Sequence, residues 1–206
     1  MFELEKIPGL AAILYNAVAA RGFKSLYKKL AEEIVTEVKS GKVLDIGTGP
    51  GCLPIEVSKL NARLEIIGID LSSKMIDLAR KNSEAAKVDR VGYELADAHN
   101  LPYPNDSFDF IFSSSSLHHW RYRNQVFREI RRVLKNDGSA YIWDFRKDAS
   151  KREIKTTIVS SSFYALYLSW ALKFHGLRTE EWRALDNRFS VRWNGALACL
   201  ILKKND

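Results

Sequence analysis

The stretch DIGTGPG at residues 45–51 follows directly on a short apolar run, KVL, at residues 42–44. The next apolar run ends in an acidic residue, Asp70. A strand, a glycine turn, a helix and a second strand ending in a carboxylate are typical of a nucleoside-binding half-site. Glycine lets the backbone approach a ligand, and the carboxylate can bind a ribose diol. The sequence therefore predicts a protein that binds a cofactor containing adenosine.

The spacing of the glycines argues against one class of cofactor. A dinucleotide fingerprint needs a glycine or alanine three residues after its second glycine. This chain has Cys52 at that position. We therefore favour a nucleoside cofactor other than NAD, and a nicotinamide oxidoreductase remains as a rival that NAD binding would reveal.

Length and charge limit the possible organisation and partners. A chain of 206 residues is long enough for one α/β domain and too short for two of ordinary size. The net charge of +7 makes a nucleic-acid partner possible, but basic and acidic residues are interleaved, so we do not favour one. Two cysteines without ligand spacing, no signal peptide and no 20-residue apolar span predict a cytoplasmic protein without a transmembrane segment.

Short apolar runs alternate with helical patterns through the middle of the chain, which predicts a parallel sheet covered on both faces. Two amphipathic helices are expected before the first strand, around residues 10–18 and 27–38, with Gly41 as the cap of the second. Asp137-Gly138 is expected to end the helix at 122–135. The strands are expected at 42–46, 64–69, 91–96, 108–113 and 139–143, and the helices at 52–60, 73–82 and 122–135.

The C-terminal region has a different pattern. Two strand-like runs, at 188–193 and 196–202, are joined by Asn194-Gly195. Asn-Gly between such runs is a strong signal for a two-residue type I′ hairpin, so the last two strands should be antiparallel. The expected fold is therefore a Rossmann-like, doubly wound α/β sheet, mostly parallel, with an antiparallel C-terminal hairpin and helices on both faces.

Several spaced motifs together resemble the class I S-adenosylmethionine-dependent methyltransferases of the type 11 group, which includes the ubiquinone and menaquinone C-methyltransferases. They are the glycine loop, the segment GIDLSSKM at 68–75, ADA at 96–98, LPYPNDSFD at 101–109 and EIRRVLK at 129–135. The resemblance implies S-adenosyl-L-methionine as the cofactor. It also implies one domain over residues 1–206: an N-terminal helical cap (1–40), a cofactor-binding core (41–145), a variable helical substrate region (146–187) and a terminal hairpin (188–206).

The motifs carry the candidate cofactor-binding residues. The glycines let the methionine portion lie against bare backbone, Asp70 accepts from the ribose hydroxyls, and Asp97 accepts from the adenine amino group. Asp45 either holds the loop or meets the methionine ammonium. The full set of candidates is Asp45, Gly47, Thr48, Gly49, Gly51, Asp70, Leu71, Met75, Asp97, Ala98 and Ser113.

His118 and His119 follow the fourth strand, at the edge where the donor methyl group should point. Either could remove a proton from an oxygen, nitrogen or activated carbon at neutral pH, or the pair could simply order the loop. Methyl transfer from a sulfonium can also proceed by positioning alone. We keep both histidines as candidate catalytic residues.

The sequence narrows the methyl acceptor without identifying it. After the fourth strand there is SSSSL at 113–117 instead of the Asn/Asp-Pro-Pro-Tyr/Phe motif of amino-directed nucleic-acid enzymes, and no acidic cluster suggests a metal. We expect a small molecule or a lipid- or quinone-like compound, acted on by a monomer or a homodimer. An RNA methyltransferase and a non-catalytic protein that binds S-adenosylmethionine are the alternatives.

Overall fold

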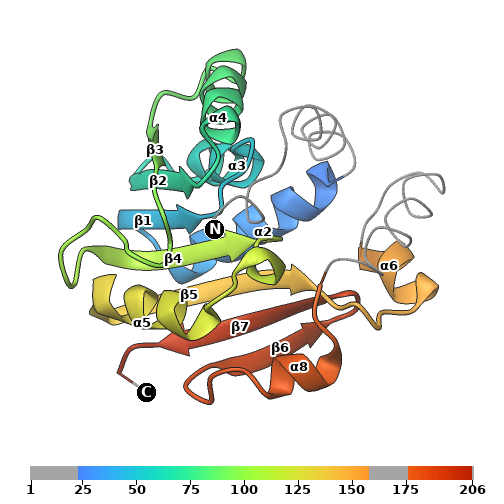
Figure 1. Cartoon of the computed structure of the whole chain (residues 1–206). Helices are drawn as coiled ribbons and strands as arrows, with labels where there is room; N and C mark the ends of the chain where they lie inside the picture. The colour runs from blue at the N-terminus through green and yellow to red at the C-terminus, as the bar shows by residue number, and fades with distance from the viewer. Residues whose placement is uncertain (1–22, 158–175, 206) are drawn as a thin grey trace.

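The computed structural model describes residues 23–157 and 176–205, in which seven strands form one sheet with helices on both faces (Figure 1). The strand order is β3-β2-β1-β4-β5-β7-β6. Strands β1 to β5 are parallel to one another, and β7 is antiparallel to both β5 and β6. The predicted fold class is confirmed. The strands are β1 (Gly41–Ile46), β2 (Leu64–Asp70), β3 (Val91–Leu95), β4 (Phe108–Ser114), β5 (Leu134–Phe145), β6 (Ser190–Asn194) and β7 (Leu197–Lys203).

The helices follow the predicted order closely. Ser72 caps its helix as expected, with its hydroxyl accepting from the backbone N–H of Met75 at 3.4 Å. The expected helix at 10–18 lies outside the described residues, as do residues 158–175 of the expected substrate region. None of the described helices is long and apolar enough to cross a membrane. The helices are α2 (Lys24–Glu37), α3 (Cys52–Leu60), α4 (Ser73–Ala85), the 3₁₀ turn η2 (Leu117–His119), α5 (Arg123–Val133), α6 (Lys151–Thr157) and α8 (Thr179–Arg183).

Two hydrophobic cores lie on the two faces of the sheet. Successive residues of a strand point to opposite faces, so Val43 packs in one core and Leu44 in the other. Helices α2, α3 and α4 cover the first face, while α5 and Trp182 of α8 cover the second. Burial on both faces explains why β1 is a continuous apolar run that includes one buried acid, Asp45.

The junction between α5 and β5 differs from the prediction. The helix ends at Val133, and Leu134 already has extended backbone and pairs with Phe108 of β4. Asp137-Gly138 therefore lies within the span of β5, and the prediction that it ends the helix is wrong. The pairing with β4 starts the strand before the glycine signal is reached.

Gly41 is also not a helix cap. Helix α2 ends at Glu37, and Gly41 begins β1 with φ of +113°. A Cβ atom there would lie 2.4 Å from Oδ2 of Asp109, the oxygen that accepts from the Lys42 N–H at 2.7 Å. Glycine is thus needed because a neighbouring strand brings a carboxylate against the backbone.

The C-terminal hairpin is confirmed, but its turn is shifted by one residue. Asn194 pairs with Leu197, so the two turn residues are Gly195 and Ala196. Only the first of them has a positive φ, +58° at Gly195. A positive φ at the first position alone is typical of a type II′ turn, so the prediction of type I′ is wrong.

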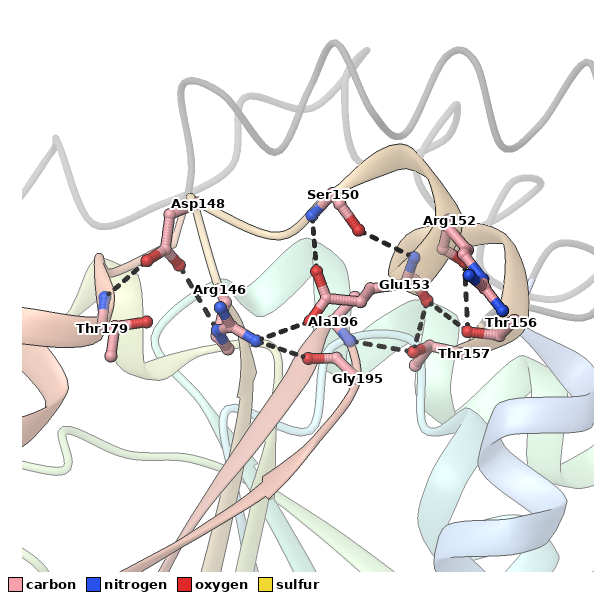
Figure 2. A network of polar contacts seen from close by, with 10 residues as sticks. All are labelled: Arg146, Asp148, Ser150, Arg152, Glu153, Thr156, Thr157, Thr179, Gly195 and Ala196. Atoms are coloured by element: carbon pink, nitrogen blue, oxygen red, sulfur yellow. Dashed lines mark hydrogen bonds and ion pairs between the residues drawn. The ribbon is translucent and has the colours of Figure 1, made fainter.

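Arg146 ties the end of β5 to this turn and to α6 (Figure 2). Its guanidinium donates to Oε1 of Glu153 at 2.9 Å and to the carbonyl of Gly195 at 3.0 Å, and its Nε lies 3.3 Å from Oδ1 of Asp148. On the other side of the turn, the Thr157 hydroxyl accepts from the Ala196 N–H at 3.0 Å. The network fixes the carboxyl end of β5 against the edge of the sheet.

Replacing Arg146 by methionine should lower the free energy of unfolding by about 1–2 kcal/mol, because hydrogen bonds to a charged group are lost while the stem is kept. Urea denaturation measures the change. Lys147→Met is the matched control, since the neighbouring side chain is exposed and should matter by less than about 0.5 kcal/mol. Equal effects of the two substitutions would contradict the anchoring role of Arg146.

Candidate active site

The glycine loop leaves the end of β1 in a conformation that only glycine adopts easily. Gly47, Gly49 and Gly51 all have positive φ, between +53° and +76°. A Cβ atom at Gly47 would lie 2.6 Å from the side chain of Ser116, which follows β4. The loop is therefore pressed against the segment after β4, where a side chain at Gly47 would clash.

A hollow of about 290 Å³ that opens to solvent lies at this loop. Four predicted cofactor-binding residues line it, together with Tyr27 of α2, Pro50 of the glycine loop and three residues that were not predicted to bind the cofactor. The lining consists of Tyr27, Asp45, Gly47, Thr48, Gly49, Pro50, Cys52, Leu53 and Ser114. The position at the carboxyl edge of a parallel sheet is where open α/β folds bind ligands.

Asp70 ends β2 and connects the glycine loop to α4. Its Oδ2 accepts from the Gly49 N–H at 3.0 Å, and its Oδ1 accepts from the Ser72 N–H at 2.9 Å. Burial raises the pKa of Asp70, although these backbone N–H groups oppose the change. The carboxylate thus holds the loop in place and retains further acceptor capacity at its two oxygens.

Asp45 is the second carboxyl group beside the glycine loop and the one that lines the hollow, and only 2% of it is exposed. Burial raises its pKa to about 7, with the Thr48 hydroxyl opposing the change and the Asp70 carboxylate adding to it. Two acidic groups beside a loop of bare backbone make the hollow suited to a cation.

Asp97 lies after β3, in the turn that follows Ala96. Its Oδ1 accepts from the backbone N–H of His99 at 2.9 Å and lies 2.7 Å from Nδ1 of the same histidine. Its side chain is 29% exposed, whereas His99 is 8% exposed. An accessible carboxylate is therefore backed by a buried imidazole.

The other candidates have mainly packing roles in this structure. Gly51 begins α3, and a Cβ atom there would lie 2.6 Å from Oη of Tyr93. Ser113 is fully buried, with its hydroxyl donating to the Ile46 carbonyl at 2.7 Å, and it is the next residue, Ser114, that lines the hollow. Met75 and Ala98 are buried, and Leu71 is partly exposed.

His118 pairs with a buried aspartate that the sequence analysis did not select. Nδ1 of His118 lies 2.9 Å from Oδ2 and 3.0 Å from Oδ1 of Asp144, and the His118 backbone N–H also donates to Oδ2 at 2.9 Å. His119 lies beside it, with ring centroids 4.0 Å apart. Because Asp144 accepts from Nδ1, the pair fixes the orientation and the tautomer of the His118 ring.

The two partners shift each other's titration. Burial lowers the pKa of His118, but the charge and hydrogen bond of Asp144 outweigh it and the net pKa is raised. Burial raises the pKa of Asp144, but the charge of His118 and two backbone N–H donors outweigh it and the net pKa is lowered. The pair therefore favours an ionised carboxylate and a histidine that binds its proton more firmly than usual.

Besides the lining residues Pro50, Cys52, Leu53 and Ser114, three residues of the site were missed from sequence. Asp144 is an acid within the apolar run YIWDF at 141–145, a signal that could have identified it. His99 directly follows the motif ADA, but no sequence pattern marks it as a residue of the site. Tyr27 fits the buried stripe of α2 and carries no sign that it reaches the hollow. Among the described residues, no group of three or more acidic, histidine or cysteine side chains could hold a metal ion.

Comparisons with known proteins agree with this geometry. Residues 44–142 match the family described as methyltransferase domain. A demethylmenaquinone methyltransferase of Thermotoga maritima is 32% identical over 163 residues, which cover 79% of this chain and 66% of that protein. The chain spans between about a third and two thirds of the length of several curated relatives that it matches.

Solved structures show the same fold. One from Methanococcus maripaludis has a TM-score of 0.74 at 23% identity, covering 98% of this chain and 95% of that one. Phosphoethanolamine N-methyltransferase 2 of Haemonchus contortus, in complex with S-adenosyl-L-methionine, has a TM-score of 0.66 at 20% identity, covering 89% of this chain and 43% of that one.

The fold and the site define a class I S-adenosylmethionine-dependent methyltransferase domain. The chain belongs to the family described as methyltransferase domain. The residues at the hollow fit the cofactor of the family, S-adenosyl-L-methionine. The glycine loop and the Asp45 carboxyl group lie in the lining, whereas Asp70 contacts the loop through the Gly49 N–H and does not itself line the hollow.

Asp45→Asn should stabilise the ligand-free protein at alkaline pH. An unfolded aspartate has a pKa near 3.9, and the folded value is about 7. Stability is therefore lost as the pH rises from about 4 to about 7, because the buried group must ionise. We expect the variant to gain a few kcal/mol at pH 8 and much less at pH 5 in urea denaturation.

Asp109→Asn is the control for this experiment. Burial raises the pKa of Asp109, but the Lys135 ammonium and the Lys42 N–H outweigh it, so the net pKa is lowered. The same substitution should therefore destabilise the protein at pH 8. A loss of stability at pH 8 in Asp45→Asn would show that Asp45 is not a strained acid.

Proposed function

We propose that this protein transfers a methyl group from S-adenosyl-L-methionine to a small-molecule acceptor, most simply a quinone precursor or a similar lipid-like compound. The observation that carries the proposal is the His118–Asp144 pair, which lies after β4 and near the end of β5, at the carboxyl edge of the sheet where the glycine loop leaves β1. The acceptor class is supported by the demethylmenaquinone methyltransferase among the relatives.

The glycine loop and three carboxyl groups would bind and orient the cofactor in this proposal. The backbone of Gly47 and Gly49 would hold the methionine portion, and Asp45 its ammonium group. Asp70 accepts from the ribose hydroxyls, each such bond contributing about 1.5–3 kcal/mol. Asp97 accepts from the adenine amino group. When bound, the sulfonium supplies an electrophilic methyl group.

His118 acts as the base in this proposal. Asp144 accepts from Nδ1–H, which fixes the ring and the tautomer in which Nε2 is the basic nitrogen, and in this proposal Nε2 takes the proton of the acceptor. The Arg146 network supports this arrangement because it anchors β5 two residues beyond Asp144. His119 packs on the ring and helps to keep its orientation.

Transfer can be tested with labelled S-adenosyl-L-methionine and a panel that contains demethylated quinols, small phenols and total RNA, with products identified by mass spectrometry. We expect label in the quinol or phenol fraction only. Label in RNA would favour the alternative of an RNA methyltransferase. Cofactor binding without transfer to any fraction would favour a non-catalytic protein.

Asp70→Ala should weaken binding of S-adenosylhomocysteine by at least about tenfold in calorimetry, because two ribose hydroxyls lose a charged acceptor. Glu65→Ala, on an exposed position of the same strand, is the control and should bind as the wild type does. If Asp70→Ala binds equally well, Asp70 does not bind the ribose.

The pH dependence of methyl transfer tests His118 as a base. Its raised pKa means that the neutral form is lost below a pH higher than usual, so the acidic limb should have its midpoint above about 6.5. Asp144→Asn removes the charge that raises this pKa and leaves burial, which lowers it. The midpoint should then move to lower pH, and the plateau rate should fall about 10- to 100-fold.

His118→Asn is the companion variant. It should abolish the acidic limb and retain binding of S-adenosylhomocysteine, since the residue does not line the hollow. An unchanged pH profile in both variants would mean that transfer proceeds by positioning alone.

A further inference from the structure

A second histidine–aspartate pair lies at the other end of the site. Both the backbone N–H and Nδ1 of His99 face one oxygen of Asp97, Oδ1, at 2.9 and 2.7 Å. A carboxylate is only an acceptor, so Nδ1 carries the hydrogen and donates. Oδ1 is therefore used by two donors of the protein, and Oδ2 is the oxygen left for a ligand.

Among the described residues, the imidazole ring of His99 has one hydrogen-bond partner, Asp97. Its Nε2 is buried and has no hydrogen-bond partner among the described residues. Burying an unpaired nitrogen costs free energy, so the ring is not placed there for its own hydrogen bonding. Its contact with Asp97 is what the buried position provides.

Helix α5 holds the turn that presents this pair. The Gln125 amide donates to the His99 carbonyl at 2.9 Å, and Glu129 accepts from the Leu101 N–H at 2.8 Å. Arg132 donates to the carbonyl of Leu101 at 3.0 Å. These three side chains occupy one face of α5 at a spacing of four and three residues. The backbone of His99 is thus fixed, and its ring can in turn fix the Asp97 carboxylate.

We propose that His99 is a positioning residue for base recognition: it locks the Asp97 carboxyl group so that Oδ2 faces the exocyclic amino group of adenine. The inference rests on the proposed role of Asp97 and extends it to a residue that the motif does not contain. Its consequence is selectivity for a 6-amino purine over a 6-oxo purine.

Calorimetry with S-adenosylhomocysteine and S-inosylhomocysteine tests this selectivity. The wild type should prefer the adenosyl compound at least tenfold. The 6-oxo group of the inosyl compound is an acceptor and cannot donate a hydrogen bond to the Asp97 carboxylate. His99→Leu should lose about fivefold or more of that preference. His99→Asn should restore most of it, since the amide nitrogen stands as far from Cβ as Nδ1 does.

Asp97→Asn gives a sharper outcome that a merely structural role would not produce. The His99 donors should hold the amide oxygen, so the amide NH₂ faces the base and the preference reverses toward the inosyl compound. In Asp97→Asn combined with His99→Leu, the reversed preference should shrink about fivefold, because the amide can rotate more easily.

The outcomes separate two failures. If the wild type fails to bind S-adenosylhomocysteine or does not distinguish the two bases, the proposed role of Asp97 falls and this inference falls with it. If the wild type distinguishes them and folded His99→Leu does so equally well, the backbone N–H is sufficient. In that case the positioning role of His99 is overturned while the proposed function stands.

Discussion

The carboxylate of Asp70 is the contact on which the rest of the site depends. It joins the N–H of Gly49, in the loop after β1, to the N–H of Ser72, at the start of α4. A loop whose glycines have positive φ gains little stability from local propensity, so it needs such a tie from outside. One partly buried acid therefore shapes the loop, and in the proposed function it also binds the ribose, which explains why the acid must stand at the end of the neighbouring strand.

Two carboxylate–histidine pairs share the site but differ in what each partner does. In His118–Asp144 the aspartate is fully buried, and the histidine, with 14% of its side chain exposed, is the proposed base. In His99–Asp97 the histidine is buried and the aspartate is accessible. In both pairs the buried partner fixes the direction of the exposed one, as the partners of metal-bound and catalytic histidines commonly do. The structure thus uses one arrangement for two different tasks.

Sequence reasoning predicted what local patterns encode and missed what arises between distant segments. Spacing and periodicity predicted the glycine loop, Asp70 and the order of the strands along the chain. One dipeptide, Asn194-Gly195, predicted the hairpin. The early start of β5, by contrast, depends on Leu134 pairing with Phe108, and the role of Gly41 depends on Asp109 of another strand. Asp144 was missed for the same reason, because its partner lies 26 residues earlier in the chain.

Tyr27 lines the hollow although it belongs to α2, which precedes the segment that matches the family. The wall of the binding site is therefore built partly by a helix whose own packing against the sheet contributes to the core. Occupation of the hollow and docking of that helix must be thermodynamically linked, since a ligand that contacts Tyr27 binds only the docked form. Protection of α2 amides from hydrogen exchange would then report the saturation of the site.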